Sequence, residues 1–110
     1  MKKLLIALLM IPAMSHAAFR TGNDLLSEMN SSDYFSRGLA LGYIMASADM
    51  ARGVWFCPPN DGGGITAGQI HDMVKNYLTN NPSIRNRAAD GILIEVLRAW
   101  YPCKSSGRGA

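Results

Sequence analysis

Apolar residues between positions 65 and 80 recur with the spacing of a one-faced α-helix. They follow the i, i+3, i+4, i+7, i+8 pattern at Ile70, Met73, Val74, Tyr77 and Leu78. Thr66 and Gln69 precede them at the N-cap and N3 positions of a capping box. The pattern predicts a helix that begins after Thr66 and ends at Asn80–Asn81.

A second apolar pattern follows directly, and it predicts a longer helix up to Trp100. Pro82 suits the first helical position, with Asn81 as the N-cap, and Pro102 prevents continuation. Arg85 and Arg87 are expected on a solvated edge of this helix. The positions expected to face the core are Ile84, Ala88, Leu93, Val96, Leu97 and Trp100.

The first half of the chain predicts one short and one long helix. The short one opens at Thr21–Asp24, with Thr21 or Asn23 as the cap, and breaks at 30–32. Ser32 is expected to cap the long helix, which spans Asp33 to about Arg52.

Small residues recur every four positions along the long helix, at Gly38, Gly42 and Ala46. Residues four apart share a helix face, so these three form a smooth stripe. Because mid-helix glycine costs roughly 1 kcal/mol relative to alanine, the stripe predicts close helix packing, within the subunit or across a dimer. The alternative is an ordinary helix that tolerates its glycines.

These patterns together predict an all-α, single-domain bundle of about four helices. The last two helices are joined by a tight turn and should be antiparallel neighbours. Cys57 precedes the third helix and Cys103 follows the fourth. A disulfide between them would therefore close the open end of a C-terminal helical hairpin.

Residues 1–17 have the pattern of a cleavable secretory signal peptide. Lys2 and Lys3 precede an apolar stretch of residues 4–14, and small residues flank the expected cleavage site between Ala17 and Ala18. A membrane anchor is the alternative, but the stretch is short against the roughly 20 residues that span a bilayer. The expected organisation is a leader (1–17), a helical domain (18–103) and a flexible tail (104–110), with no membrane association after cleavage.

Export changes how charge and cysteines are interpreted. Loss of Lys2 and Lys3 lowers the formal charge from +3 to +1, and no basic tract remains to favour a nucleic-acid partner. Two cysteines in an exported chain favour a disulfide. For a loop as long as 57–103 the chain-entropy model assigns it roughly 4 kcal/mol. The alternative is that Cys57 is a free nucleophile with His71 as its base.

No catalytic or metal-binding pattern stands out. His71–Asp72 lacks a marked nucleophile, and one histidine with dispersed carboxylates makes no ligand cluster. We therefore expect no enzyme activity, no metal and no cofactor, and a protein that binds another protein. Trp55, Phe56 and Trp100 are either interface anchors or core residues.

Six short motifs in order resemble the Rap/Tai family of type VI secretion immunity proteins. They are Thr21-Gly22-Asn23-Asp24-Leu25-Leu26, Gly42-Tyr43-Ile44 with Asp49, Phe56-Cys57-Pro58, Ile65-Thr66-Ala67-Gly68-Gln69 with Val74, Tyr77 and Leu78, Asn81-Pro82 with Arg85 and Ala89, and Trp100-Tyr101-Pro102-Cys103. The resemblance implies an all-helical periplasmic immunity protein that dimerises and occludes a cell-wall amidase effector. Members usually carry a second cysteine pair, where this chain has Met29 and Ala40.

The loop before the third helix is the segment expected to fill the amidase cleft. It consists of Pro58, Pro59, Asn60, Asp61, Gly62, Gly63 and Gly64. The alternative is that this loop only connects two helices. The alternative function is a periplasmic helical stress or chaperone-like protein that binds no single partner.

Overall fold

The computed structural model describes residues 19–59 and 64–104 and confirms the all-α expectation for them. Its elements are α1 (Gly22–Met29), α2 (Tyr34–Ala51), α3 (Ala67–Asn80), the 3₁₀ turn η3 (Pro82–Ile84) and α4 (Ala89–Trp100). The expected leader, the loop positions 60–63 and the tail beyond Lys104 lie outside the described residues.

Capping boxes begin α1 and α3. In α1 the Asp24 amide donates to Thr21 Oγ1 (3.2 Å) and the Thr21 amide donates to Asp24 Oδ2 (3.0 Å). In α3 the Gln69 amide donates to Thr66 Oγ1 (3.1 Å) and Gln69 Oε1 accepts from the Thr66 amide (2.8 Å). Both boxes satisfy amides that the first helical turn leaves without intrahelical partners.

The start of α2 differs from the prediction by one residue, because Asp33 and not Ser32 is its N-cap. Asp33 Oδ2 accepts from the Ser36 amide (3.0 Å) and the Ser36 hydroxyl (2.9 Å). These bonds, the amide's first, hold the pKa of the Asp33 carboxyl below its ordinary value. The Ser31 hydroxyl accepts from the Asp33 amide (2.9 Å) and so fixes the turn before the helix.

The expected continuous helix from Pro82 was wrong, because η3 ends at Ile84 and α4 begins only at Ala89. Residues 20–23, which we call the N-terminal strap, form hydrogen bonds with backbone groups of the segment between η3 and α4 and of the first residue of α4. The Gly22 amide donates to Arg87 O (3.0 Å), the Asn23 amide to Arg85 O (2.8 Å), and the Ala89 amide to Arg20 O (2.9 Å). Because the Ala89 amide donates to the strap, it does not make the helical bond to the carbonyl of Arg85, four residues earlier.

Two side chains near this break also differ from the prediction. Asn81 occupies the N-cap position of η3, as predicted, but its side chain makes no capping bond there; its Nδ2 donates to Tyr77 O (2.8 Å) at the end of α3. Arg85 is half-buried and not solvated, and its Nη1 donates to Leu78 O (3.2 Å). Both side chains thus satisfy carbonyls in the last turn of α3.

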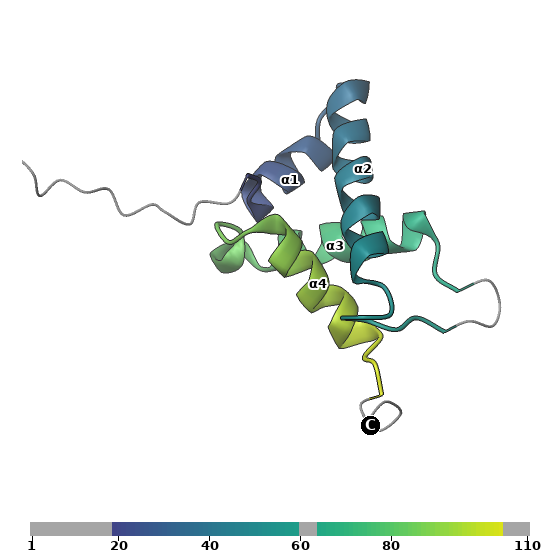
Figure 1. Cartoon of the computed structure of the whole chain (residues 1–110). Coiled ribbons are helices and arrows are strands. Elements are labelled where there is room, and N and C mark those ends of the chain that lie inside the picture. The colour runs from purple at the N-terminus through teal and green to yellow at the C-terminus, as the bar shows by residue number, and fades with distance from the viewer. Residues whose placement is uncertain (1–18, 60–63, 105–110) are drawn as a thin grey trace, which may run out of the picture.

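All four described α-helices contact one another around one core (Figure 1). The buried residues are Leu25, Met29, Ala40, Ile44, Ala48, Ala51, Phe56, Ile65, Ile70, Val74, Leu78, Ala89, Ile92, Leu93, Val96 and Leu97. Leu93, Val96 and Leu97 face inward as predicted, Ile84 and Ala88 are half-buried, and Trp100 is 65% exposed. Met29 and Ala40, which the resemblance places near the usual second cysteine pair, both belong to this core.

The closest packing of a glycine in the described helices occurs at Gly22 in the strap. A Cβ there would lie 2.8 Å from Ile92 Cδ1, 3.0 Å from Arg85 O and 3.0 Å from Leu78 Cδ2. Arg20, the residue before the N-cap Thr21, is fixed by an ion pair with Glu28. Its Nη2 donates to Glu28 Oε2 (2.6 Å) and its Nε donates to Glu28 Oε1 (3.1 Å). The start of α1 is therefore wedged between α3 and α4.

We predict that Gly22→Ala destabilises the fold by about 1–3 kcal/mol, the usual effect of overpacking. The new methyl group would meet a backbone carbonyl that already binds the strap. Urea unfolding followed by circular dichroism measures the change.

Gly91→Ala is the matched control, because Gly91 also lies in the first turn of a helix and a Cβ there would have no neighbour within 4 Å. It should be neutral or stabilising by up to about 1 kcal/mol. Equal stability of the two variants would contradict the wedge.

Candidate partner-binding surface

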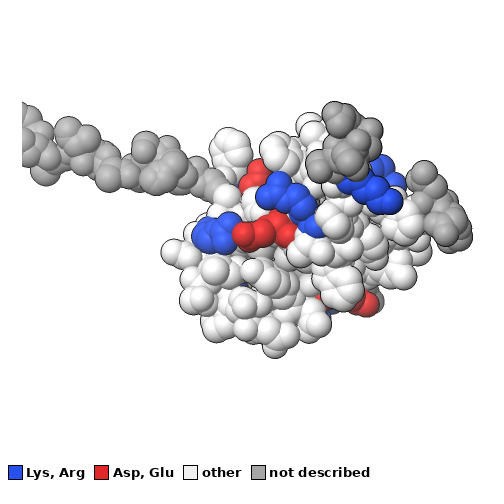
Figure 2. Space-filling view, turned by 90° about the horizontal axis from the view of Figure 1, so that it is seen from below, with Lys and Arg blue, Asp and Glu red and all other residues white. Residues whose placement is uncertain are grey.

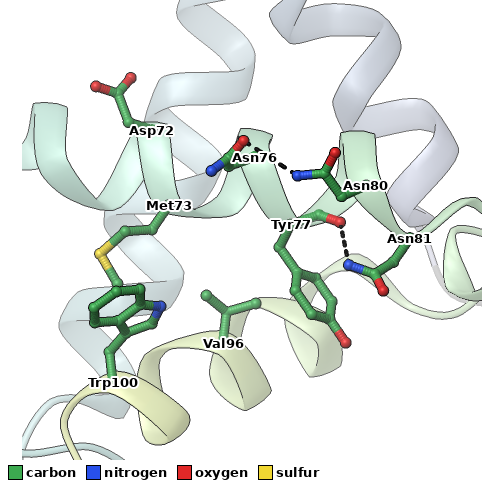
Figure 3. Close-up of a pocket in the computed structure, with 8 residues that line it drawn as sticks. All are labelled: Asp72, Met73, Asn76, Tyr77, Asn80, Asn81, Val96 and Trp100. Carbon is green, nitrogen blue, oxygen red and sulfur yellow. Dashed lines mark hydrogen bonds between the residues drawn. The ribbon is translucent and has the colours of Figure 1, made fainter.

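A disulfide joins Cys57 to Cys103, as the sequence predicts, across a separation of 46 residues. The two Cα atoms lie 4.8 Å apart, and the Cys57 amide donates to Tyr101 O (2.8 Å). The chain has two cysteines, so the bond leaves no thiol for the alternative of a Cys57 nucleophile. The turn that follows α2 is thereby tied to the segment just after α4. The helices α3 and α4 run in opposite directions (Figure 3).

The turn between α2 and the disulfide holds an exposed apolar pair outward. Gly53 has φ +80°, and its amide donates to Phe56 O (2.8 Å), while the Trp55 amide donates to Ala51 O (2.8 Å). Phe56 is fully buried, whereas Val54 and Trp55 are 67% and 49% exposed. Of the aromatic residues singled out in the sequence, Phe56 is therefore a core residue, and Trp55 and Trp100 lie on the surface.

Met50 joins this pair from the last turns of α2 and is 83% exposed. We call Met50, Val54 and Trp55 the apolar tip. A shallow hollow beside it lies between α2 and α4 and includes Asp90 and Ile94. The Arg98 guanidinium lies over the Trp55 ring, 5.7 Å from its centroid, which helps to fix the indole.

The expected cleft-filling loop follows the apolar tip, and only its flanks are described. The backbone leaves the helical body on both sides of residues 60–63 (Figure 1). Gly64 has φ +73°, and a Cβ at that position would lie 3.2 Å from Pro59 O, so the flanks approach closely. Buried Phe56 and Ile65 anchor them in the core. The loop tip lies outside the described residues, and its role stays a prediction.

The small-residue stripe of α2 lies on the surface. Gly38, Gly42 and Ala46 are exposed, and no described atom of another element lies within 4 Å of a Cβ at either glycine. Phe35 and Leu39, on the same side of the helix, are 71% and 41% exposed. The close contact expected within the subunit forms at Gly22 instead, and a contact across a dimer remains a prediction.

A groove between α3 and α4 was not predicted from the sequence (Figure 3). Its volume is about 350 Å³, and its lining residues are Asp72, Met73, Asn76, Tyr77, Asn80, Asn81, Val96 and Trp100. Sequence patterning assigned the apolar members to the core. The signal that could have indicated the groove is the placement of Asn76, Asn80 and Asn81 around Tyr77.

Charges on the described surface are mixed and partly paired. Figure 2 shows positive and negative residues interspersed on one face, with uncharged areas between them. Arg87 pairs with Glu95 (3.3 Å), and His71 Nδ1 contacts Asp72 Oδ1 (3.2 Å) on the first turns of α3. Within residues 19–59 and 64–104 there is neither a cluster of metal-binding side chains nor a helix able to span a membrane.

The chain matches a known protein family. The family model for Rap1a immunity proteins matches residues 21–103, which run from the N-cap of α1 to the second cysteine of the disulfide. No curated protein matches the chain. The matched segment coincides with the helical domain described above.

We predict that reduction of the disulfide lowers the free energy of unfolding by up to about 4 kcal/mol, the chain-entropy value for a loop of this length. Urea unfolding with and without a reductant measures the loss. The variant Cys57→Ser/Cys103→Ser should have the free energy of unfolding of the reduced protein, and the reductant should not change it. An unchanged unfolding midpoint of the native protein on reduction would contradict a stabilising role.

Proposed function

Because the chain belongs to the Rap1a immunity protein family, we propose that it is a periplasmic immunity protein that binds and occludes a cell-wall amidase. The family is one of type VI secretion immunity proteins, which are not typically enzymes. The observation that carries the proposal is the match over residues 21–103, the whole of the described helical domain. The amidase as the target follows from the resemblance of the six motifs.

Occlusion needs a rigid body that places a protruding segment in a cleft. The disulfide, buried Phe56 and the close approach of Pro59 and Gly64 hold the base of the loop. A base that is ordered before binding lowers the entropic cost of association. We therefore keep Pro58–Gly64 as the segment that enters the amidase cleft.

The apolar tip supplies the contact area that the loop lacks. Tryptophan and methionine are enriched at protein interfaces, and tryptophan is frequent among the residues that dominate binding energy. Trp55 lies two residues before the disulfide and is held by Ala51 and Arg98. Met50, Val54 and Trp55 are thus proposed to contact the amidase surface around its cleft.

Export to the periplasm is part of the same proposal. The pattern of residues 1–17 supports a cleaved leader, and a disulfide persists in oxidising compartments outside the cytoplasm. The Cys57–Cys103 bond fits that environment. Periplasmic delivery would place the protein where an amidase meets the cell wall.

The exposed face of α2 supports a homodimer. Gly38, Gly42 and Ala46 let a second backbone approach closely, and Phe35 and Leu39 supply apolar area beside them. In a two-fold symmetric dimer the same patch serves both subunits. We propose that α2 packs against α2 of a second copy through this face.

We predict that replacing residues 58–64 with a glycine–serine linker of equal length abolishes amidase binding and leaves the melting temperature unchanged. The linker keeps the anchors Cys57 and Ile65. Calorimetric titration with an amidase against which the full chain protects cells, and survival of cells that export that amidase, measure the loss.

A variant that ends at Lys104 is the control and should bind and protect as the full chain does. Unchanged affinity of the linker variant would remove the loop from the binding surface. Binding of unfolded client proteins in place of a single amidase would favour the stress-protein alternative.

We predict that Leu39→Glu converts a wild-type dimer to a monomer, because the charge would have to be buried against its symmetry-related copy. Sedimentation equilibrium measures the mass. Val54→Glu, a matched change at an exposed apolar residue outside α2, should remain dimeric. A monomeric wild type, or dissociation by both substitutions, would contradict the α2 interface.

A further inference from the structure

The groove between α3 and α4 has aromatic residues at its two ends. Tyr77 and Trp100 flank Val96, and Met73 lies against the indole (Figure 3). Trp100 is 65% exposed although it lies in the last turn of an otherwise buried helix face. The groove thus presents two flat aromatic rings, those of Tyr77 and Trp100, with Val96 between them.

The rim of the groove carries side-chain amides whose hydrogen bonding is incomplete. Asn80 Nδ2 donates to Asn76 Oδ1 (3.4 Å), and Asn81 Nδ2 donates to Tyr77 O (2.8 Å). A side-chain amide offers two donor hydrogens and one acceptor oxygen. These two bonds therefore leave Asn76 Nδ2 and the carbonyl oxygens of Asn80 and Asn81 available to a ligand.

Lysine and arginine are absent from the residues that line the described groove, and its single charge is Asp72 at one end. An anionic ligand would lack a counter-charge, and one carboxylate cannot surround a cation. Amides, a phenol and an indole suit an uncharged molecule that both donates and accepts hydrogen bonds. The exposed indole face suits a flat apolar surface on that molecule.

We propose that this groove binds an N-acetylated amino sugar. A pyranose ring has an apolar face of C–H groups that would pack on Trp100, and hydroxyl groups at its edge that would bond the asparagines. An acetamido group has one donor and one acceptor, as the rim amides do. The volume of about 350 Å³ lies near the lower end of the range for small-molecule sites and fits a short stretch of sugar.

A protein segment is the competing occupant, and the groove fits it less well. The residues that anchor a protein interface are surrounded by contacts that exclude water. The groove has little such surrounding surface, because its exposed apolar area is mainly that of two aromatic side chains and its rim is polar. The inference goes beyond the proposed immunity function, since the groove shares no residue with the loop or the apolar tip. It would give the protein a contact with carbohydrate while another surface holds the amidase.

The two tryptophans allow a direct test, because the chain has only Trp55 and Trp100. We would titrate the isotopically labelled full chain with tetra-N-acetyl-chitotetraose and follow both indole N–H resonances. The expected result is a saturable shift of the Trp100 resonance and an unchanged Trp55 resonance. Trp100→Ala should weaken binding about tenfold, which corresponds to about 1.4 kcal/mol, while Trp55→Ala should bind as the wild type does.

Cellotetraose, which has the same rings without acetamido groups, is the ligand control and should shift Trp100 more weakly. Equal shifts from both sugars would overturn the assignment to an amino sugar. Absence of a Trp100 shift, or equal shifts of both indoles, would overturn the site. Loss of amidase binding by Trp100→Ala without any sugar-induced shift would make the groove a protein contact instead.

Cosedimentation with purified peptidoglycan separates the two sources of such a sugar. A shift by the soluble oligomer together with cosedimentation supports binding to the cell-wall strand. A shift without cosedimentation supports binding to free oligosaccharide. Asn76→Ala should reduce both signals if the rim amide contacts the sugar, and its melting temperature should remain that of the wild type because Asn76 is exposed.

Discussion

The backbone contact between residues 20–23 and residues 85–89 is the constraint on which the helical arrangement depends. It ends η3, sets the first residue of α4 and places the start of α1 between two helices. A Cβ atom at Gly22 would lie within about 3 Å of Ile92, of Leu78 and of the Arg85 carbonyl oxygen. Because one short segment makes all of these bonds, a shift of the strap would leave several amides and carbonyls unsatisfied at once.

The disulfide constrains the end of α4 that lies opposite the strap. The strap holds the turn between α3 and α4, and the Cys57–Cys103 bond ties the turn that follows α2 to the end of α4. The helix α4 is therefore held at both ends, by hydrogen bonds at its start and by a covalent bond just after its last turn. The same bond fixes one side of the base of the loop, because Pro58 directly follows the bonded Cys57.

The parts of the structure that depend on neighbouring residues or on composition were predictable from the sequence, and the parts that depend on distant contacts were not. Thr66 with Gln69, and Cys57 with Cys103, are short-range or composition signals, and the structure confirms both. The break before α4 arises from hydrogen bonds to the distant strap at residues 20–23, which no local pattern contains. The glycines of α2 were conspicuous because of their spacing, whereas Gly22 was hidden in a helix start, where glycine is unremarkable in sequence.

The neighbouring residues Trp55 and Phe56 show why the surface could not be assigned from the sequence. Both are aromatic and close to a cysteine, yet Phe56 is fully buried and Trp55 is half-exposed. The positive φ of Gly53 and the bond from its amide to Phe56 O set this division, because they reverse the chain so that one side chain enters the core and the other leaves it. Exposing an indole forgoes part of its burial energy, and here the turn that buries Phe56 leaves Trp55 partly in solvent with Arg98 over its ring. Trp100 is exposed in a different setting, in the last turn of α4, so the exposure of the two indoles has two separate local origins.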